Sequence, residues 1–145
     1  MITSKVYLTQ TDTTIGFISQ DADRLTQIKQ RPPHKHYIKA VDSLATLKSH
    51  TRIPTTCKNS VRRARKSTFI LPNGASYRVV IHDRKHLMLI SKLGWAYTTS
   101  ANLSNQTFDE QWARSVADEV IEPLEGNSEP SNIFKINNRN MQKIR

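Results

Sequence analysis

Three short polar clusters in this 145-residue chain have side chains that could bind a charged ligand. They are Thr11-Asp12-Thr13, Lys29-Gln30-Arg31-Pro32, and the run from Thr98 to Ser104. Each lies at the end of a predicted strand or helix, where a side chain can leave the scaffold. Hydroxyl, amide and cationic groups of these kinds hold phosphates and other polar substrates. The clusters therefore indicate binding and positioning of a charged substrate.

Lys29 and Arg31 carry the most specific geometric expectation. Residues two apart point to opposite sides of a continuous helix, so the two cations must leave the helix to act together. Pro32 biases Arg31 toward an extended conformation, so we expect the helix to end near Lys29 and both cations to face one ligand. Arg31 would bind a phosphate through two parallel hydrogen bonds, and Lys29 would contribute a single positive charge. The alternative is two solvated cations at a helix end.

The run after the apolar strand at 95–97 is the most distinctive in the chain. In an extended segment Ser100 and Asn102 project to the same side while Ala101 packs inward. A hydroxyl and an amide would then be presented together. The Thr11-Asp12-Thr13 cluster is weaker evidence on its own, because Thr and Asp are also ordinary helix-capping residues.

Other common sites have little support. The four glycines form no phosphate-binding loop, and the five histidines form no helical pair with a catalytic Glu. His34 and His36 lie in a basic segment that would repel a metal cation, so we expect no metal site built from side chains. Cys57, the only cysteine, is interpreted as a partly buried side chain. Because it has no partner for a disulfide within the chain, a cytoplasmic location is expected.

The net charge of +10 is unevenly distributed. The stretch from Arg24 to Lys66 holds twelve Lys or Arg against a single acid, Asp42. The stretch from Asp109 to Glu129 holds seven acids against Arg114 alone. We therefore expect a positive face and a separate negative one, and a polyanionic partner such as a nucleic acid or a nucleotide. The alternative is a basic surface that only keeps the protein soluble.

Apolar patterning places these clusters on an open mixed α/β sheet flanked by helices, in one domain spanning 1–145. The hydrophobic content of 37% is enough to close one core, and no apolar run approaches a membrane-spanning length. Capping signals predict a helix from Asp21, short helices from Asp42 and Pro54, and a helix opened by a capping box at Thr107 and Glu110. Further elements are predicted as strands at 6–8, 37–41, 67–71, 77–82, 95–99 and 133–136 and a helix at 87–93.

Taken jointly, the clusters resemble motifs of the threonylcarbamoyl-adenylate synthase family, the YrdC-like proteins. Thr11-Asp12-Thr13 with Gly16 is similar to its Pro-Thr-Glu-Thr-x-x-Gly segment, and Lys29-x-Arg31-Pro32 matches its Lys-x-Arg-Pro. The run from Thr99 to Ser104 matches its Thr-Ser-Ala-Asn-Leu-Ser. Further similarities are found in Ser67-Thr68-Phe69-Ile70-Leu71-Pro72, in Tyr77-Arg78-Val79 with His82, in Pro130-Ser131-Asn132-Ile133, and in Arg145.

The resemblance implies a YrdC-like fold and a nucleotidyltransferase. Such an enzyme condenses L-threonine, bicarbonate and ATP to threonylcarbamoyl-adenylate and pyrophosphate, for modification of tRNA by a pathway with further proteins. Mg²⁺ would be held mainly through the phosphates. The implied catalytic residues are Lys29, Arg31, Ser100 and Asn102. Threonine would contact Thr13, Ser100 and Ser131, and the nucleotide Arg31, Lys35, Thr68, Asn102 and Arg145.

The chain is shorter than usual members of that family, and some motif positions differ, such as Gln10 in place of a proline. A second hypothesis is therefore a non-catalytic module of the same fold that binds tRNA or double-stranded RNA through the Arg24 to Lys66 face. Presence of Lys29, Arg31, Ser100 and Asn102 together favours the enzyme, because an RNA surface needs cations but not an inward-facing Ser and Asn.

Overall fold

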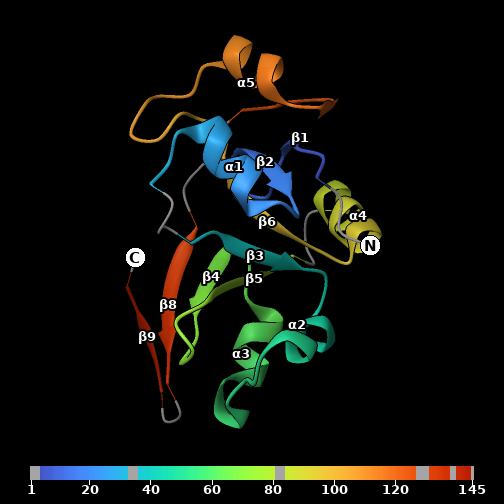
Figure 1. Ribbon diagram of the computed structural model, residues 1–145. Helices are drawn as coiled ribbons and strands as arrows, with labels where there is room; N and C mark the ends of the chain where they lie inside the picture. Colours follow the sequence, from blue (N-terminus) through green and yellow to red (C-terminus); the bar gives the residue numbers. More distant parts are fainter. Residues whose placement is uncertain (1–3, 33–35, 81–83, 127–130, 138–139, 145) are drawn as a thin grey trace.

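Nine strands form one sheet in the computed structural model, which describes residues 4–32, 36–80, 84–126, 131–137 and 140–144 (Figure 1). The strand order is β7-β1-β2-β6-β3-β5-β4-β8-β9. The strands are β1 Tyr7–Gln10, β2 Ile15–Ser19, β3 Ile38–Val41, β4 Ser67–Ile70, β5 Ser76–Val79, β6 Trp95–Ser100, β7 Glu119–Ile121, β8 Asn132–Ile136 and β9 Met141–Lys143. The helices are α1 Ala22–Lys29, α2 Leu44–His50, the 3₁₀ turn Thr55–Cys57, α3 Lys58–Arg63, α4 Arg84–Leu93 and α5 Glu110–Val116.

The register of the central strands decides which side chains share a face of the sheet. β3 pairs antiparallel with β6 and parallel with β5, and Lys39 lies opposite both Tyr97 and Tyr77. Ile38 lies opposite Thr98 on β6. Because successive residues of a strand point to opposite faces, the aromatic row with Lys39 and the row with Ile38 lie on opposite sides of the same three strands.

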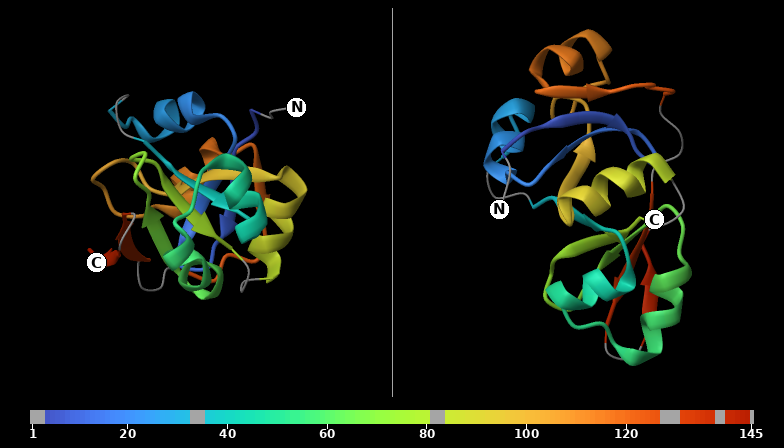
Figure 2. Two further views of the ribbon diagram at one scale, coloured as in Figure 1. Left: turned by 90° about the horizontal axis from the view of Figure 1, so that it is seen from below. Right: turned by 90° about the vertical axis from the view of Figure 1, so that its right-hand side faces the viewer.

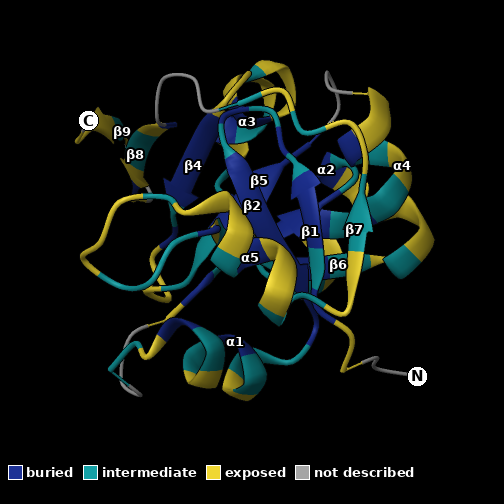
Figure 3. Ribbon diagram, turned by 90° about the horizontal axis from the view of Figure 1, so that it is seen from above, coloured by how far each residue is buried: buried dark blue, intermediate teal, exposed yellow. Residues whose placement is uncertain are grey.

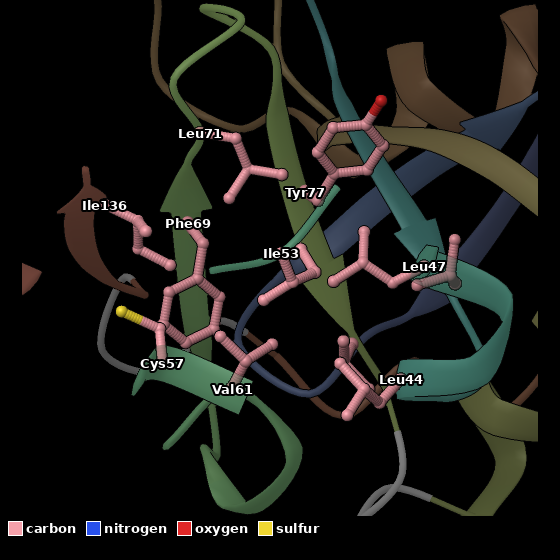
Figure 4. Packing of buried hydrophobic residues seen from close by; sticks show 11 residues of the cluster. Leu44, Leu47, Ile53, Cys57, Val61, Phe69, Leu71, Tyr77 and Ile136 are labelled. Carbon is pink, nitrogen blue, oxygen red and sulfur yellow. The ribbon is translucent and has the colours of Figure 1, made fainter. Parts of the chain in front are cut away.

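Helices cover both faces and bury three apolar clusters. On the Lys39 side, α1 and α5 pack over residues such as Phe17, and α2 and α3 pack over Phe69 and its neighbours (Figure 4). On the other side, α4 packs against Ile18 and Ala40. The first pair of helices lies at one end of the molecule and the second pair at the other (Figure 2). The strands between them are largely buried, while the helices expose one side to solvent (Figure 3).

The expected open mixed α/β sheet is confirmed. Three strands were not expected from the sequence: β2, and the three-residue strands β7 and β9. The predicted capping box of α5 is wrong, because Asp109 caps this helix by accepting a hydrogen bond from the amide of Trp112. None of the helices in the described ranges combines the length and apolar character that crossing a bilayer requires.

Candidate functional site

A pocket of about 310 Å³ opens on the Ile38 side of the sheet, where several elements end. Its walls come from the turn between β1 and β2, the segment after α1, the start of β3, the middle of β5, the end of β6 and the residue before β8. These contribute Thr13, Arg31, Ile38, Arg78, Ser100 and Ser131, among others. All three polar clusters singled out in the sequence therefore contribute residues to one cavity.

The turn between β1 and β2 is held by the side chain of Thr11. Its hydroxyl donates to the carbonyl of Thr14 at 2.7 Å and accepts from the amides of Thr13 and Thr14 at 3.3 and 3.1 Å. Gly16, just after the turn, lets the backbone of β2 lie close to Thr99 of β6 and to the side chain of Thr11. A Cβ there would lie 2.9 Å from the carbonyl oxygen of Thr99 and 3.1 Å from Cγ2 of Thr11. The glycine thus lets the Thr13 turn lie against β6.

The end of α1 separates the two cations. Gln30 adopts a left-handed conformation, with φ of 53°, and its amide bonds the carbonyl of Gln27 while the amide of Arg31 bonds the carbonyl of Thr26. This pair of bonds is a Schellman motif, which ends a helix and reverses the direction of the chain. Lys29 is therefore the last helical residue, and Arg31 leaves on a different path, as the position of Pro32 predicts.

Lys29 differs from the expectation, because its side chain turns into the protein. It is 3% exposed, and its ammonium donates to the carbonyl oxygens of Ser100 and Asn102 at 2.6 and 2.7 Å. Burial, together with the charge of Arg31, lowers the pKa of Lys29 to about 8. The described contacts of Lys29 thus fix the backbone of the segment that carries Ser100 and Asn102, instead of reaching into the pocket.

The buried position of Lys29 predicts a pH-dependent stability. Above pH 8 the folded chain releases the Lys29 proton, while the unfolded chain keeps it up to about 10.4. Since the unfolded chain then binds more protons, this residue makes folding more favourable as pH rises through that window. Urea unfolding should be measured for the wild type and for Lys29→Met at pH 7 and at pH 10. Relative to the variant, the wild type should have a higher free energy of unfolding at pH 10 than at pH 7. The same difference at both pH values would contradict a lowered pKa of Lys29.

Arg31 lines the pocket, and few protein groups hold it. One terminal nitrogen donates to the carbonyl of His36 at 2.9 Å, and the guanidinium carbon lies 4.5 Å from the centre of the Tyr37 ring. Its Nε is buried and makes no hydrogen bond within the described part of the chain. Stacking on Tyr37 orients the guanidinium, and the remaining donors are available to an anion.

Arg78 is the second guanidinium of the pocket, and it is buried at 5% exposure. It donates to Asp12 at 2.7 Å and to the hydroxyl of Thr68 at 3.5 Å, and Thr68 lies 3.1 Å from the hydroxyl of Ser131. This chain of contacts ties β5, the β1–β2 turn, β4 and the start of β8 together. In the sequence, Asp12 belongs to a polar cluster and Arg78 to a matched strand, but neither residue was predicted to have a role in the site. A cation among the apolar residues of a predicted strand was the available signal.

Ser100 and Asn102 lie together as expected, although β6 ends at Ser100 and the chain bends at 101 and 102 instead of continuing as a strand. The Ser100 hydroxyl donates to Oδ1 of Asn102 at 2.5 Å, and Ala101 between them is 1% exposed. The Asn102 amide nitrogen donates to the carbonyls of Leu103 and Gln106 at 2.9 and 2.8 Å. Ser100 lines the pocket, while the described contacts of Asn102 close the loop behind it. Two predicted nucleotide contacts, Lys35 and Arg145, lie outside the described residues.

The cavity thus combines guanidinium donors with a ring of hydroxyls. Arg31 and Arg78 supply positive charge, and Thr13, Ser100 and Ser131 supply neutral donors and acceptors. Such a set can bind a phosphate or carboxylate and stabilise negative charge that develops on it. Asp12, the carboxylate nearest to Arg78, is already paired with it. The arrangement is suited to a reaction in which positioning and charge neutralisation do the main work.

Comparison with known sequences gives distant relatives. No protein-family model matches the chain. It is 30% identical over 138 residues to the uncharacterized protein MG259 homolog of Mycoplasma pneumoniae, which covers 89% of this chain and 30% of that protein. It is 32% identical over 100 residues to the uncharacterized protein MG259 of Mycoplasma genitalium, covering 68% of this chain and 21% of that protein. The chain therefore spans less than a third of the length of these relatives.

Comparison with solved structures gives a consistent fold. P. abyssi Sua5 complexed with L-threonine superposes with a TM-score of 0.77 at 19% identity, over 97% of this chain and 50% of that one. E. coli YciO superposes with a TM-score of 0.74 at 15% identity, over 98% of this chain and 82% of that one. At these identities the similarity establishes the arrangement of the backbone across nearly the whole chain.

Proposed function

We propose, from the YrdC-like fold of this chain, that it makes threonylcarbamoyl-adenylate and pyrophosphate from L-threonine, bicarbonate and ATP. The observation that carries the proposal is the shared pocket. Two guanidinium groups, Arg31 and Arg78, line it together with the hydroxyl-bearing residues Thr13, Ser100 and Ser131. The L-threonine bound in P. abyssi Sua5, a protein of the same fold, supports threonine as a substrate.

The proposed reaction forms a C–N bond and then a mixed anhydride between the carbamate and the α-phosphate, and it breaks the phosphoanhydride between the α- and β-phosphates of ATP. The threonine amine condenses with bicarbonate to a carbamate, with loss of water, and a carbamate oxygen then attacks the α-phosphorus of ATP. The bond between the α-phosphorus and the bridging oxygen breaks, and pyrophosphate leaves with the electron pair. No oxidant or reductant is required. The carbamate is short-lived in water, so the protein contributes by holding it beside the phosphate and excluding solvent.

Each pocket residue has a proposed role in that reaction. Arg31 binds the phosphates of ATP with its free donors, and Arg78 compensates the charge that develops as pyrophosphate leaves. Thr13, Ser100 and Ser131 orient threonine and the carbamate, and Thr68 supports Ser131 from behind. Lys29 is a positioning residue, because it holds the Ser100 segment through backbone carbonyls. Mg²⁺ enters with ATP, bound through phosphate oxygens.

Pyrophosphate release from ATP is the direct test. We expect release that requires both threonine and bicarbonate, and that falls to background when either is omitted or when carbon dioxide is removed from the buffer. The Ser131→Ala variant should raise the KM for threonine more than the KM for ATP. Release that continues without threonine, or no release from folded protein supplied with all three substrates and Mg²⁺, would overturn the proposal.

The exposed cations favour a second candidate function, a module that binds tRNA or double-stranded RNA without catalysis. Arg62 and Arg63 on α3 are exposed, as are Arg65 and Lys66 after it and Lys48 on α2. In a double variant, Arg62→Gln with Arg63→Gln, the slope of log K against log salt concentration for tRNA binding should become less steep. The change should correspond to about two fewer released counterions. Such binding by a protein that releases no pyrophosphate would favour the module over the enzyme.

A further inference from the structure

A second pocket, of about 400 Å³, lies on the opposite side of the sheet from the proposed catalytic site. Its floor contains Tyr77, Lys39 and Tyr97, which are in register on β5, β3 and β6. Residues of α1, including Ala22 and Thr26, form one wall, and the β4–β5 turn forms another. The pocket meets the catalytic one only at His36 and Tyr37, which line both. Its volume is in the range of small-molecule sites.

The walls of this pocket are built from aromatic rings around one cation. The Tyr37 and Tyr97 ring centres lie 6.3 Å apart, and Trp95 packs edge-on against Tyr97 at 5.2 Å. The Lys39 ammonium lies 4.4 Å from the Trp95 ring centre and 5.5 Å from that of Tyr97. The rings hold Lys39 in place, and within the described residues no carboxylate forms an ion pair with it. Burial lowers the pKa of Lys39, as expected for a cation without such a partner.

The hydroxyl of Tyr77 also contributes to the pocket. Tyr77 is 6% exposed, and its ring closes the margin of the apolar cluster under α2 and α3 while its hydroxyl points away from that cluster (Figure 4). Among the described residues this hydroxyl makes no hydrogen bond, in contrast to that of Tyr37, which lies 3.0 Å from the Thr26 hydroxyl. A hydroxyl that lines the pocket and is held by no described protein group is free to donate to a ligand.

The charges around the pocket restrict the ligand further. Asp23 lines the rim from the first turn of α1 and is exposed. A dianion such as a phosphate monoester would be repelled by this carboxylate more strongly than a monoanion. Flat aromatic rings pack best against aromatic walls, where they bury a large area in offset or edge-on contacts. The chemistry of the walls, the floor and the rim thus selects an aromatic ring with one carboxylate.

We propose that this pocket binds an aromatic carboxylate, with the ring against Tyr37 and Tyr97, the carboxylate on Lys39, and the Tyr77 hydroxyl donating to it. The site is distinct from the one proposed for adenylate formation, because its cation and the rings of Tyr77 and Tyr97 face the opposite side of the sheet. The two pockets meet at His36 and Tyr37, which line both.

Binding of 1-naphthoate tests this proposal in the full chain. Trp112→Phe leaves Trp95 as the only tryptophan, and its fluorescence reports on the pocket through its contacts with Lys39 and Tyr97. We expect saturable binding of 1-naphthoate with a dissociation constant of about 1 mM or tighter. Lys39→Met, which keeps the side-chain stem on the rings, should weaken binding at least about tenfold. Lys85→Met, which removes an exposed cation on α4, should leave it unchanged.

Two further ligands distinguish binding at this site from nonspecific hydrophobic binding. 1-Naphthalenemethanol, which lacks the charge, should bind wild type and Lys39→Met equally, and this result would also show that the variant pocket is intact. Cyclohexanecarboxylate should bind at least about tenfold more weakly than 1-naphthoate. Absence of naphthoate binding, equal binding by Lys39→Met, or loss of binding in the catalytic-pocket variant Ser131→Ala would each overturn the proposal. Pyrophosphate release plays no part in these measurements, so they fail or succeed separately from the proposed reaction.

Discussion

Replacing Arg31 with alanine is expected to slow pyrophosphate release from ATP by at least about a hundredfold. The guanidinium is stacked on Tyr37 and bonded to one carbonyl, that of His36, so it is oriented before substrate arrives. A preoriented cation stabilises charge that develops on the phosphates at no cost of reorganisation during the reaction. The loss should therefore appear in kcat as well as in kcat/KM.

The stability of Arg31→Ala should stay close to that of the wild type. Its described contacts are one hydrogen bond to a backbone carbonyl and one ring face, which contribute little to folding. Arg31→Lys keeps the charge but loses the planar fork, so we expect an activity between those of the wild type and the alanine variant. Arg84→Ala, at an exposed position on α4, is the matched control and should release pyrophosphate at the wild-type rate. Wild-type turnover by a folded Arg31→Ala protein would show that Arg31 plays no part in the reaction.

The sequence was sufficient to place the polar clusters, because their positions follow from local signals. Asp21 caps α1 by accepting from the amide of Arg24, and Gly94 after α4 has φ of 89°, as a helix-ending glycine should. The run after β6 predicted that Ser100 and Asn102 would lie together, and they are hydrogen-bonded, although through a bend and not through an extended segment. Each of these features depends on residues a few positions apart, which a pattern can capture.

The direction of the two cations depended on information that the sequence pattern did not carry. Pro32 indicated where α1 ends, but not that Gln30 would adopt a left-handed conformation. That single residue turns Arg31 toward the pocket and leaves Lys29 pointing at the carbonyls of Ser100 and Asn102. A non-glycine residue with positive φ is uncommon, so propensity alone gave no reason to expect it.

The missed strands have separate causes: β7 has a partner distant in sequence, β9 is very short, and β2 is interrupted by a glycine. β7 has three residues and pairs with β1, more than one hundred positions earlier, and β9 has three residues at the sheet edge. Runs of this length carry no clear alternation. β2 was hidden by Gly16, which weakens a strand pattern but here allows close packing on Thr99. The contact between Asp12 and Arg78 is similarly non-local, and only the assembled sheet brings it about.

That contact leads to the largest effect on stability that we expect. Replacing Asp12 with alanine should lower the free energy of unfolding by about 3–5 kcal/mol. The Asp12 and Arg78 side chains are 11% and 6% exposed, and their atoms lie 2.7 Å apart. Removing the carboxylate leaves a guanidinium buried without its counterion, and the fold must bear the cost of desolvating that charge. Urea unfolding monitored by fluorescence measures the change directly.

Two variants distinguish an unpaired buried charge from a simple loss of packing. Replacing both partners, as in Asp12→Ala with Arg78→Met, removes the charge along with its counterion and should recover a large part of the stability lost in Asp12→Ala. Glu119→Ala breaks the exposed pair with Lys5, where the side chains are 51% and 59% exposed, and should cost no more than about 1 kcal/mol. If the double variant were less stable than Asp12→Ala by the full cost of a second mutation, the two side chains would not be energetically coupled. The double variant should nevertheless release no pyrophosphate, because Arg78 supplies charge to the pocket as well as to the fold.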